Sequence, residues 1–172
     1  MLSPAIADTL ERFRGDPSAA RSTPTVTATL VNGHARLSAG AFNWDADLPA
    51  SLGGGNLAPS PTAYLLGALA GCAVAFLSDT LAPQFGVRVD AVTATARCAS
   101  DARGLLGIDD TSAELTSLEL DIEIHSPDPA EDVESMLAAW RARCPIYLAL
   151  LRPNGVALTS RVASARPAST LV

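Results

Sequence analysis

The stretch that decides the fold is residues 59–77, PSPTAYLLGALAGCAVAFL. Ser60 can cap the free N–H groups at a helix start, and Pro61 stands where a helix tolerates proline best. The residues that follow are apolar on nearly the whole circumference of a predicted helix that ends near Pro83 and Gly86. Such a helix must be buried on all sides, and burial between two subunits would achieve this more easily than one domain alone.

The uncharged apolar run inside this helix, Ala63–Leu77, is shorter than the roughly 18 residues that a membrane span needs. We therefore expect a core helix and no membrane association. The first 14 residues have no basic start followed by an apolar run, so no signal peptide is expected. These features favour a cytoplasmic protein.

The composition indicates one globular domain. With 172 residues, 48% of them apolar and 17% charged, the chain is long and apolar enough to bury a core. A net charge of -6 gives no basic surface, so no nucleic-acid partner is expected. Three cysteines are too few, and odd in number, for a secreted disulfide framework, and they suit a reducing compartment.

Residues 1–24 are predicted to form an N-terminal helix and a linker, because Ile6, Leu10 and Phe13 follow helical spacing. Three strands should come next, with the hairpin signal Asn32-Gly33 between the first two. They are expected at residues 25–30, 34–38 and 41–48. The loop Gly53-Gly54-Gly55-Asn56 matches no nucleotide-binding pattern and is interpreted as a mobile turn.

Beyond the central helix the pattern alternates as in strands and then becomes helical again. Strands are expected at 87–98, 115–124 and 156–162, and helices at 131–143 and 146–151. Residues 99–112 should be a polar connection. This order predicts an α+β fold with antiparallel sheet, in one domain spanning residues 25–164, followed by a flexible tail at 165–172.

Two of the three cysteines are candidates for chemistry. Cys72 follows Gly71, and small neighbours let a substrate approach its sulfur, although a free cysteine in a buried helix is often only a small apolar residue. Cys144 precedes Pro145 and would cap the next helix, where free N–H groups and nearby Arg141 and Arg143 favour a thiolate.

The remaining sites give weaker signals. Cys98 lies on the apolar face of a strand and is expected to be a core residue. A metal-thiolate site using His34 or His125 has no recognisable ligand spacing, and no metal is expected. No nucleophile-elbow pattern of a serine hydrolase occurs.

The segment from Pro59 to Cys72 resembles the OsmC/Ohr family, the osmotically induced and organic hydroperoxide resistance proteins. Further matches lie on both sides of it and extend the resemblance over nearly the whole chain. They are Asp47-Leu48-Pro49, Gly53-Gly54, Gly86-Val87 and Cys144-Pro145.

The resemblance implies an intertwined α+β homodimer with curved antiparallel sheets around long central helices. It also implies thiol-dependent reduction of organic hydroperoxides. Cys72 would be the peroxidatic residue that forms a sulfenic acid, and Cys144 the resolving residue that condenses with it to a disulfide. No cofactor is needed, and an external dithiol, such as a lipoyl or thioredoxin-type protein, would restore both thiols.

The chain departs from the family pattern at the start of the central helix. Family peroxidases carry a glutamate there that holds a catalytic arginine, whereas this chain has Thr62 and Ala63. Arg36, in the first hairpin, is the nearest candidate for that arginine, with Arg21 as the second choice. The alternative function is a catalytically weak OsmC-like module that binds a small apolar ligand at the dimer interface.

Overall fold

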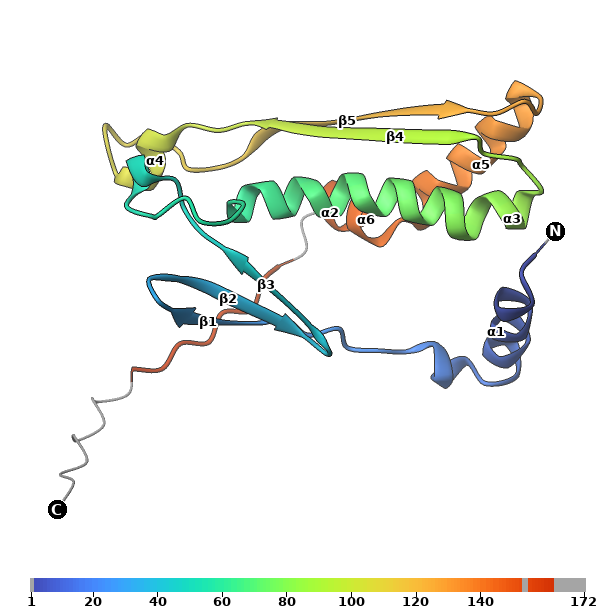
Figure 1. Cartoon of the computed structure of the whole chain (residues 1–172), viewed down its shortest axis with the longest axis horizontal. Helices are drawn as coiled ribbons and strands as arrows, with labels where there is room; N and C mark the ends of the chain where they lie inside the picture. The colour runs from blue at the N-terminus through green and yellow to red at the C-terminus, as the bar shows by residue number, and fades with distance from the viewer. Residues whose placement is uncertain (1, 153–154, 163–172) are drawn as a thin grey trace, which may run out of the picture.

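The structure, a computed structural model, describes residues 2–152 and 155–162. One long helix runs through its centre, with a two-stranded sheet above it, a three-stranded sheet below it and two further helices beside it (Figure 1). Both sheets are antiparallel. The predicted α+β class is therefore confirmed.

The N-terminal part contains helix α1 (Pro4–Gly15), a 3₁₀ turn η1 (Pro17–Ala20) and three strands. The strands are β1 (Thr27–Val31), β2 (His34–Ala39) and β3 (Phe42–Ala46), paired in that order. Asn32 and Gly33 adopt φ of 50° and 86° between β1 and β2, as a tight hairpin turn requires. The predicted N-terminal helix and hairpin are present.

The central helix consists of α2 (Pro61–Ala75), a π-helical segment η3 (Phe76–Leu81) and α3 (Ala82–Phe85). It begins as predicted, since Ser60 Oγ accepts a hydrogen bond of 3.2 Å from the Ala63 N–H. The π-helical segment was not predicted; it lies just before Pro83, which has no N–H to donate to an α-helical turn. Gly86, at φ 69°, ends the helix.

The length and composition of Pro61–Phe85 would suffice to cross a membrane, since an 18-residue window of it has a mean hydropathy of 1.8. The core helix of a soluble protein passes the same test. Here, however, only 28% of that apolar stretch is buried within one chain. The helix is thus the expected central element, but a single copy of the chain leaves much of it uncovered.

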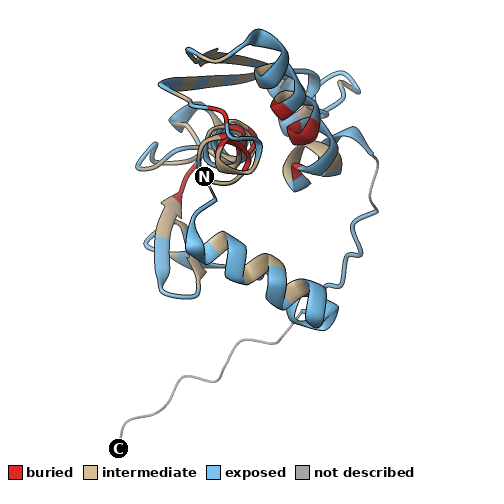
Figure 2. Cartoon of the chain, turned by 90° about the vertical axis from the view of Figure 1, so that its right-hand side faces the viewer, coloured by how far each residue is buried: buried red, intermediate tan, exposed pale blue. Residues whose placement is uncertain are grey.

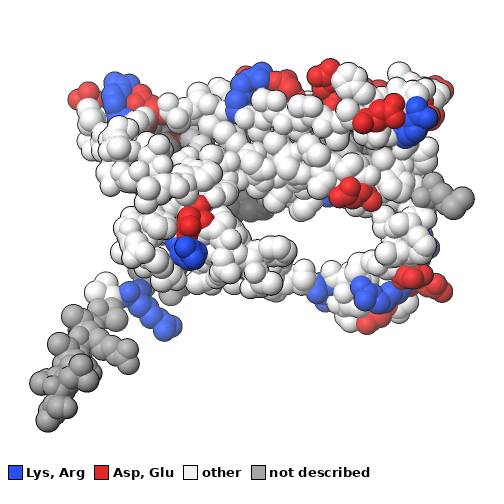
Figure 3. Space-filling view, viewed as in Figure 1, with Lys and Arg blue, Asp and Glu red and all other residues white. Residues whose placement is uncertain are grey.

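The upper sheet pairs β4 (Ala91–Ala99) with β5 (Thr116–His125). Its inner face packs Val92, Ala94, Leu120 and other apolar residues against the core, while its outer face is charged (Figure 3). The intervening segment contains a short helix, α4 (Ala102–Leu106), which replaces part of the predicted polar connection.

Helices α5 (Ala130–Arg143) and α6 (Pro145–Leu151) complete the core. The side chains in its centre are almost inaccessible to solvent and come from the second half of the central helix and from α5 and its end (Figure 2). They are Leu77, Leu81, Met136, Trp140 and Cys144.

The predicted last strand is wrong. Residues 156–162 form no strand, and Val156 and Leu158 are 92% and 88% exposed. The alternation of apolar residues there is genuine, but the segment pairs with no other strand of the described chain. The predicted tail at 165–172 lies outside the described residues.

The glycine loop, which includes the 3₁₀ turn η2 (Ala50–Leu52), is anchored on a buried carboxylate. Asp47 accepts hydrogen bonds from the N–H groups of Leu48, Gly55 and Leu57 at 2.8–3.0 Å. These bonds, that from Leu57 above all, lower the pKa of Asp47. The loop therefore already holds a negative group and is not a phosphate cradle.

We predict that Gly54→Ala destabilises the protein, because the added Cβ would stand 2.0 Å from the backbone oxygen of Leu48. The free energy of unfolding should fall by about 2 kcal/mol or more, since rigid backbone must move. Urea denaturation measures the change. Gly15→Ala is the matched control, because open space surrounds that position; equal stabilities of the two variants would contradict the prediction.

Candidate active site

Cys72 and Cys144, 72 residues apart in the chain, meet in the structure with their Sγ atoms 3.1 Å apart. Cys72 comes from the last turns of α2, and Cys144 from the junction of α5 and α6. Both are free thiols. A disulfide needs about 2.05 Å, so the two sulfurs are about 1 Å from bonding distance.

The junction at Cys144 is fixed by its backbone and by its sulfur. Its N–H donates to Trp140 O at 2.8 Å and ends α5, and its extended backbone precedes Pro145, the first residue of α6. Its Sγ then accepts the Tyr147 N–H at 3.5 Å. The predicted capping position of Cys144 is thereby present.

The two thiols differ in their access to solvent. Cys144 is completely buried, whereas Cys72 is half-buried. Burial, followed by the hydrogen bond to Cys144 and the charge on Cys144, raises the pKa of the Cys72 thiol to about 11. Cys72 is therefore the thiol that a substrate can reach, but within one chain it is mostly protonated at neutral pH.

The first turn of α6 supplies a group that sequence reasoning missed. A hydrogen bond from the backbone of Ile146 lowers the pKa of Cys72, in opposition to the effect of burial. Together with the Tyr147 N–H on Cys144, this turn directs backbone donors at both sulfurs. The Cys144-Pro145 pair signals such a helix start, but only the tertiary packing places Cys72 beside it.

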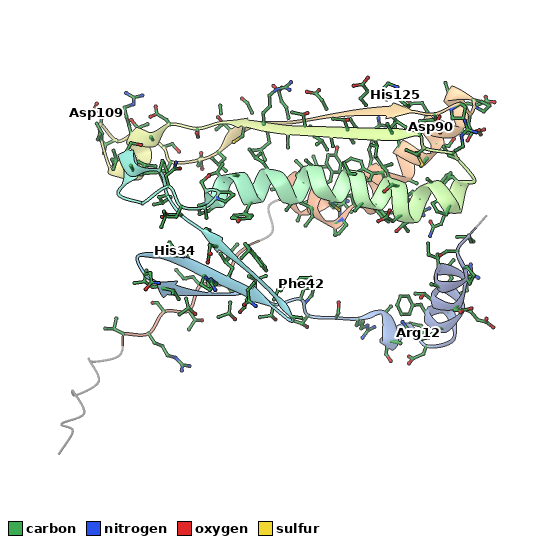
Figure 4. The ribbon with its side chains drawn as sticks, in the orientation of Figure 1. Arg12, His34, Phe42, Asp90, Asp109 and His125 are labelled. Atoms are coloured by element: carbon green, nitrogen blue, oxygen red, sulfur yellow. The ribbon has the colours of Figure 1, made fainter. Side chains whose placement is uncertain are left out.

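Arg36 lies on β2 in the lower sheet, where its guanidinium pairs with Asp45 on the neighbouring strand. His34, labelled on the same sheet in Figure 4, lies 3.5 Å from the same carboxylate. Within the described chain, the ion pair and hydrogen bonds of Arg36 are to Asp45 and not to either thiol. Arg21 stands in the linker, exposed.

The cations closest in sequence to Cys144 also face other groups. Arg143 donates to Gln84 Oε1 at 3.4 Å, and Arg141 lines a cavity together with Trp140 and Tyr147. Thr62 and Ala63 occupy the first turn of α2, and neither side chain is a carboxylate. Cys98 is half-buried and free, and no cluster of three or more metal-ligating side chains occurs among residues 2–152 and 155–162.

An apolar cavity of about 440 Å³ is lined by residues from the elements that carry the thiols, although neither cysteine lines it. Two of its lining residues are neighbours of the thiols: Leu69, one turn before Cys72, and Tyr147, whose N–H donates to Cys144. Leucines of α2, β5 and α6 form most of its wall, among them Leu65, Leu118, Leu120 and Leu150. The cavity suits a small apolar group.

Residues 53–159, more than half of the chain, match the sequence profile of the OsmC-like protein family. The chain belongs to the OsmC-like family. Some solved structures of similar fold are named as hydroperoxide resistance proteins. A search of the curated proteins returned no match.

Solved structures of the OsmC-like family share this fold at low sequence identity. An OsmC-like protein from Mycoplasma pneumoniae is 21% identical, with a TM-score of 0.63, over 76% of this chain and 88% of its own. An organic hydroperoxide resistance protein from Legionella pneumophila is 18% identical, with a TM-score of 0.53, over 75% and 89%. An OsmC-like hydroperoxide resistance protein from Jannaschia is 20% identical, with a TM-score of 0.50, over 81% and 92%.

We predict that Cys144→Ser lowers the pKa of Cys72 from about 11 toward the ordinary value of 9.0, because both contributions of Cys144 raise it. Burial remains, so the shift should be partial. The thiolate absorbance near 240 nm, followed between pH 7 and 12 in a Cys98→Ser background, measures it. An unchanged or higher titration midpoint would show that Cys144 does not hold the proton on Cys72.

Proposed function

We propose that this protein is a thiol-dependent peroxidase that reduces organic hydroperoxides with Cys72 and Cys144. The observation that carries the proposal is the 3.1 Å contact between a half-buried and a fully buried free thiol. Membership of the OsmC-like family and the similar fold of structures named as hydroperoxide resistance proteins support it. The apolar cavity lined by Leu69 and Tyr147 favours an alkyl or aryl hydroperoxide over hydrogen peroxide.

In the proposed reaction, the Cys72 thiolate attacks the terminal oxygen of the hydroperoxide. The O–O bond breaks, the alkoxide takes up the thiol proton and leaves as an alcohol, and Cys72 becomes a sulfenic acid. Cys144 then attacks that sulfur, water leaves, and a disulfide forms. An external dithiol reduces the disulfide by exchange and returns both protons.

Cys72 attacks first because a peroxide can reach it and because the first turn of α6 stabilises its thiolate. A peroxide can reach Cys72 but not the completely buried Cys144. The Ile146 backbone stabilises the Cys72 thiolate, although burial works against it. A further cation at the site, from Arg36 or from a second subunit, would complete the activation of Cys72.

We also propose that the working form is a homodimer in the reducing cytoplasm. The central helix leaves small residues exposed along one face, namely Gly67, Ala68, Gly71 and Ala75, which would allow close approach of a second helix. Apolar residues of the lower sheet are also uncovered, with Leu30 78% and Phe42 76% exposed. Surfaces of this kind are typical of an interface.

The second candidate function is a ligand-binding module with little peroxidase activity. The raised pKa of Cys72 and the absence of a carboxylate at Thr62 and Ala63 favour it. The apolar cavity would then hold a small apolar ligand. Saturable binding of such a ligand, without any thiol loss on exposure to peroxide, would identify this function.

Thiol titration tests the leading proposal. Two thiols per chain should disappear on addition of cumene hydroperoxide and return with dithiothreitol. Cys72→Ser should lower the rate of peroxide loss by at least about 1,000-fold, because the nucleophile is removed. Cys144→Ser should retain one turnover and leave a sulfenic acid that dimedone traps. Cys98→Ser is the control and should react as the wild type does.

Unchanged thiol titres after peroxide treatment would contradict the peroxidase proposal.

We predict that Leu118→Asp weakens turnover of cumene hydroperoxide by raising KM about 10-fold or more, because it places a charge in the wall of the apolar cavity. Turnover of hydrogen peroxide should change little. Leu105→Asp, at an exposed position on α4 outside this cavity, is the matched control. Equal loss with both peroxides would indicate general damage and not loss of a binding wall.

A further inference from the structure

Helix α1 has an apolar stripe with almost nothing beneath it. It is 12 residues long, is capped by Ser3, and contains no buried residue. Ile6, Leu10 and Phe13 share one face and are only half-buried. Within the described chain, its one extensive packing partner is the short turn η1. A helix of this length is marginally stable alone in water, so we expect another apolar surface to pack against its stripe.

An opening passes between α1 and the helical layer, as the space-filling view shows (Figure 3). In the ribbon view α1 lies across this opening from the end of the central helix (Figure 1). The central helix is itself under-covered, with 28% of its apolar stretch buried and Phe85 39% exposed. The opening therefore separates α1 from a central helix that is largely uncovered within one chain.

Helix α1 carries equal numbers of acidic and basic side chains, and the central helix is almost uncharged. The last turn of α1 carries Arg12 and Arg14. The stretch Pro61–Phe85 carries a single charged residue, the exposed Asp79. On α1 the two arginines are balanced by Asp8 and Glu11. Helices that bind anionic lipid have a polar face rich in Lys and Arg, so the balance on α1 favours a protein partner.

We propose that α1 is an arm that packs its Ile6–Leu10–Phe13 stripe against the central helix of a second copy of this chain, which occupies the opening. This inference rests on the homodimer proposed above. α1 precedes residues 53–159, the part of the chain that matches the family profile. It would add a peripheral apolar contact to an interface built on the small-residue face of α2.

Photo-cross-linking in the full chain tests where the arm lies. Benzoylphenylalanine at position 13 should yield a dimer-sized band on a denaturing gel after irradiation, with the attached peptide from residues 61–85. In a mixture of isotopically light and heavy chains, half of the cross-linked product should join one light and one heavy chain. The same probe at the polar position Glu11 is the control and should yield much less. A cross-link within one chain would overturn the proposal.

Sedimentation equilibrium tests the contribution of the arm separately from the formation of the dimer. Phe13→Asp should raise the dimer dissociation constant at least 10-fold, whereas Glu11→Ala should leave it unchanged. Gly71→Leu, on the small-residue face, tests the main interface. If the wild type is monomeric, the homodimer proposal and the arm fail together. If Phe13→Asp dimerises as tightly as the wild type, the arm alone is wrong.

Vesicles of anionic phospholipid provide the test against a membrane partner. Wild-type protein should remain in the supernatant when such vesicles are sedimented. Co-sedimentation that Phe13→Asp abolishes would assign the stripe to a lipid surface and overturn the proposal.

Discussion

The need to bury one long apolar helix governs the rest of this structure. An 18-residue window of Pro61–Phe85 has a mean hydropathy of 1.8, and each neighbouring element covers part of the helix. The β4–β5 sheet covers one side, and α5 and α6 cover another. That burial also brings the thiols together, because covering the second half of the helix places the α5–α6 junction against Cys72. The candidate site is thus a product of core packing rather than of a separate loop.

The sequence predicts those elements whose ends are marked by residues that favour a helix cap or a turn. Ser60-Pro61 marks the start of the central helix, Asn32-Gly33 the hairpin, and Cys144-Pro145 the junction of two helices. Family resemblance adds the pairing of Cys72 with Cys144, which local physics alone leaves open. Their 3.1 Å contact agrees with that pairing. The roles of attacking and resolving thiol stay a proposal.

What could not be predicted depends on contacts distant in sequence. The Ile146 backbone acts on Cys72 only because α6 packs on α2. Residues 156–162 alternate like a strand, but a strand forms only when it pairs with a neighbouring strand, and they pair with none in the described chain. The short helix α4 is capped by Asp101 and ended by Gly107, signals that are weak in a segment already rich in polar residues and turns.

The π-helical segment determines how many successive side chains of the central helix stay on the face that packs against the core. Its four most buried positions before α3 are four residues apart: Leu69, Ala73, Leu77 and Leu81. In a regular α-helix each such step rotates the side chain by about 40° beyond a full turn, so the row would wind off the core. The wider turn of Phe76–Leu81 rotates less per residue and opposes that drift. Leu81 therefore stays on the same face of the helix as Leu77. The rotation of the helix about its axis, and not only its length, matches the layer that covers it.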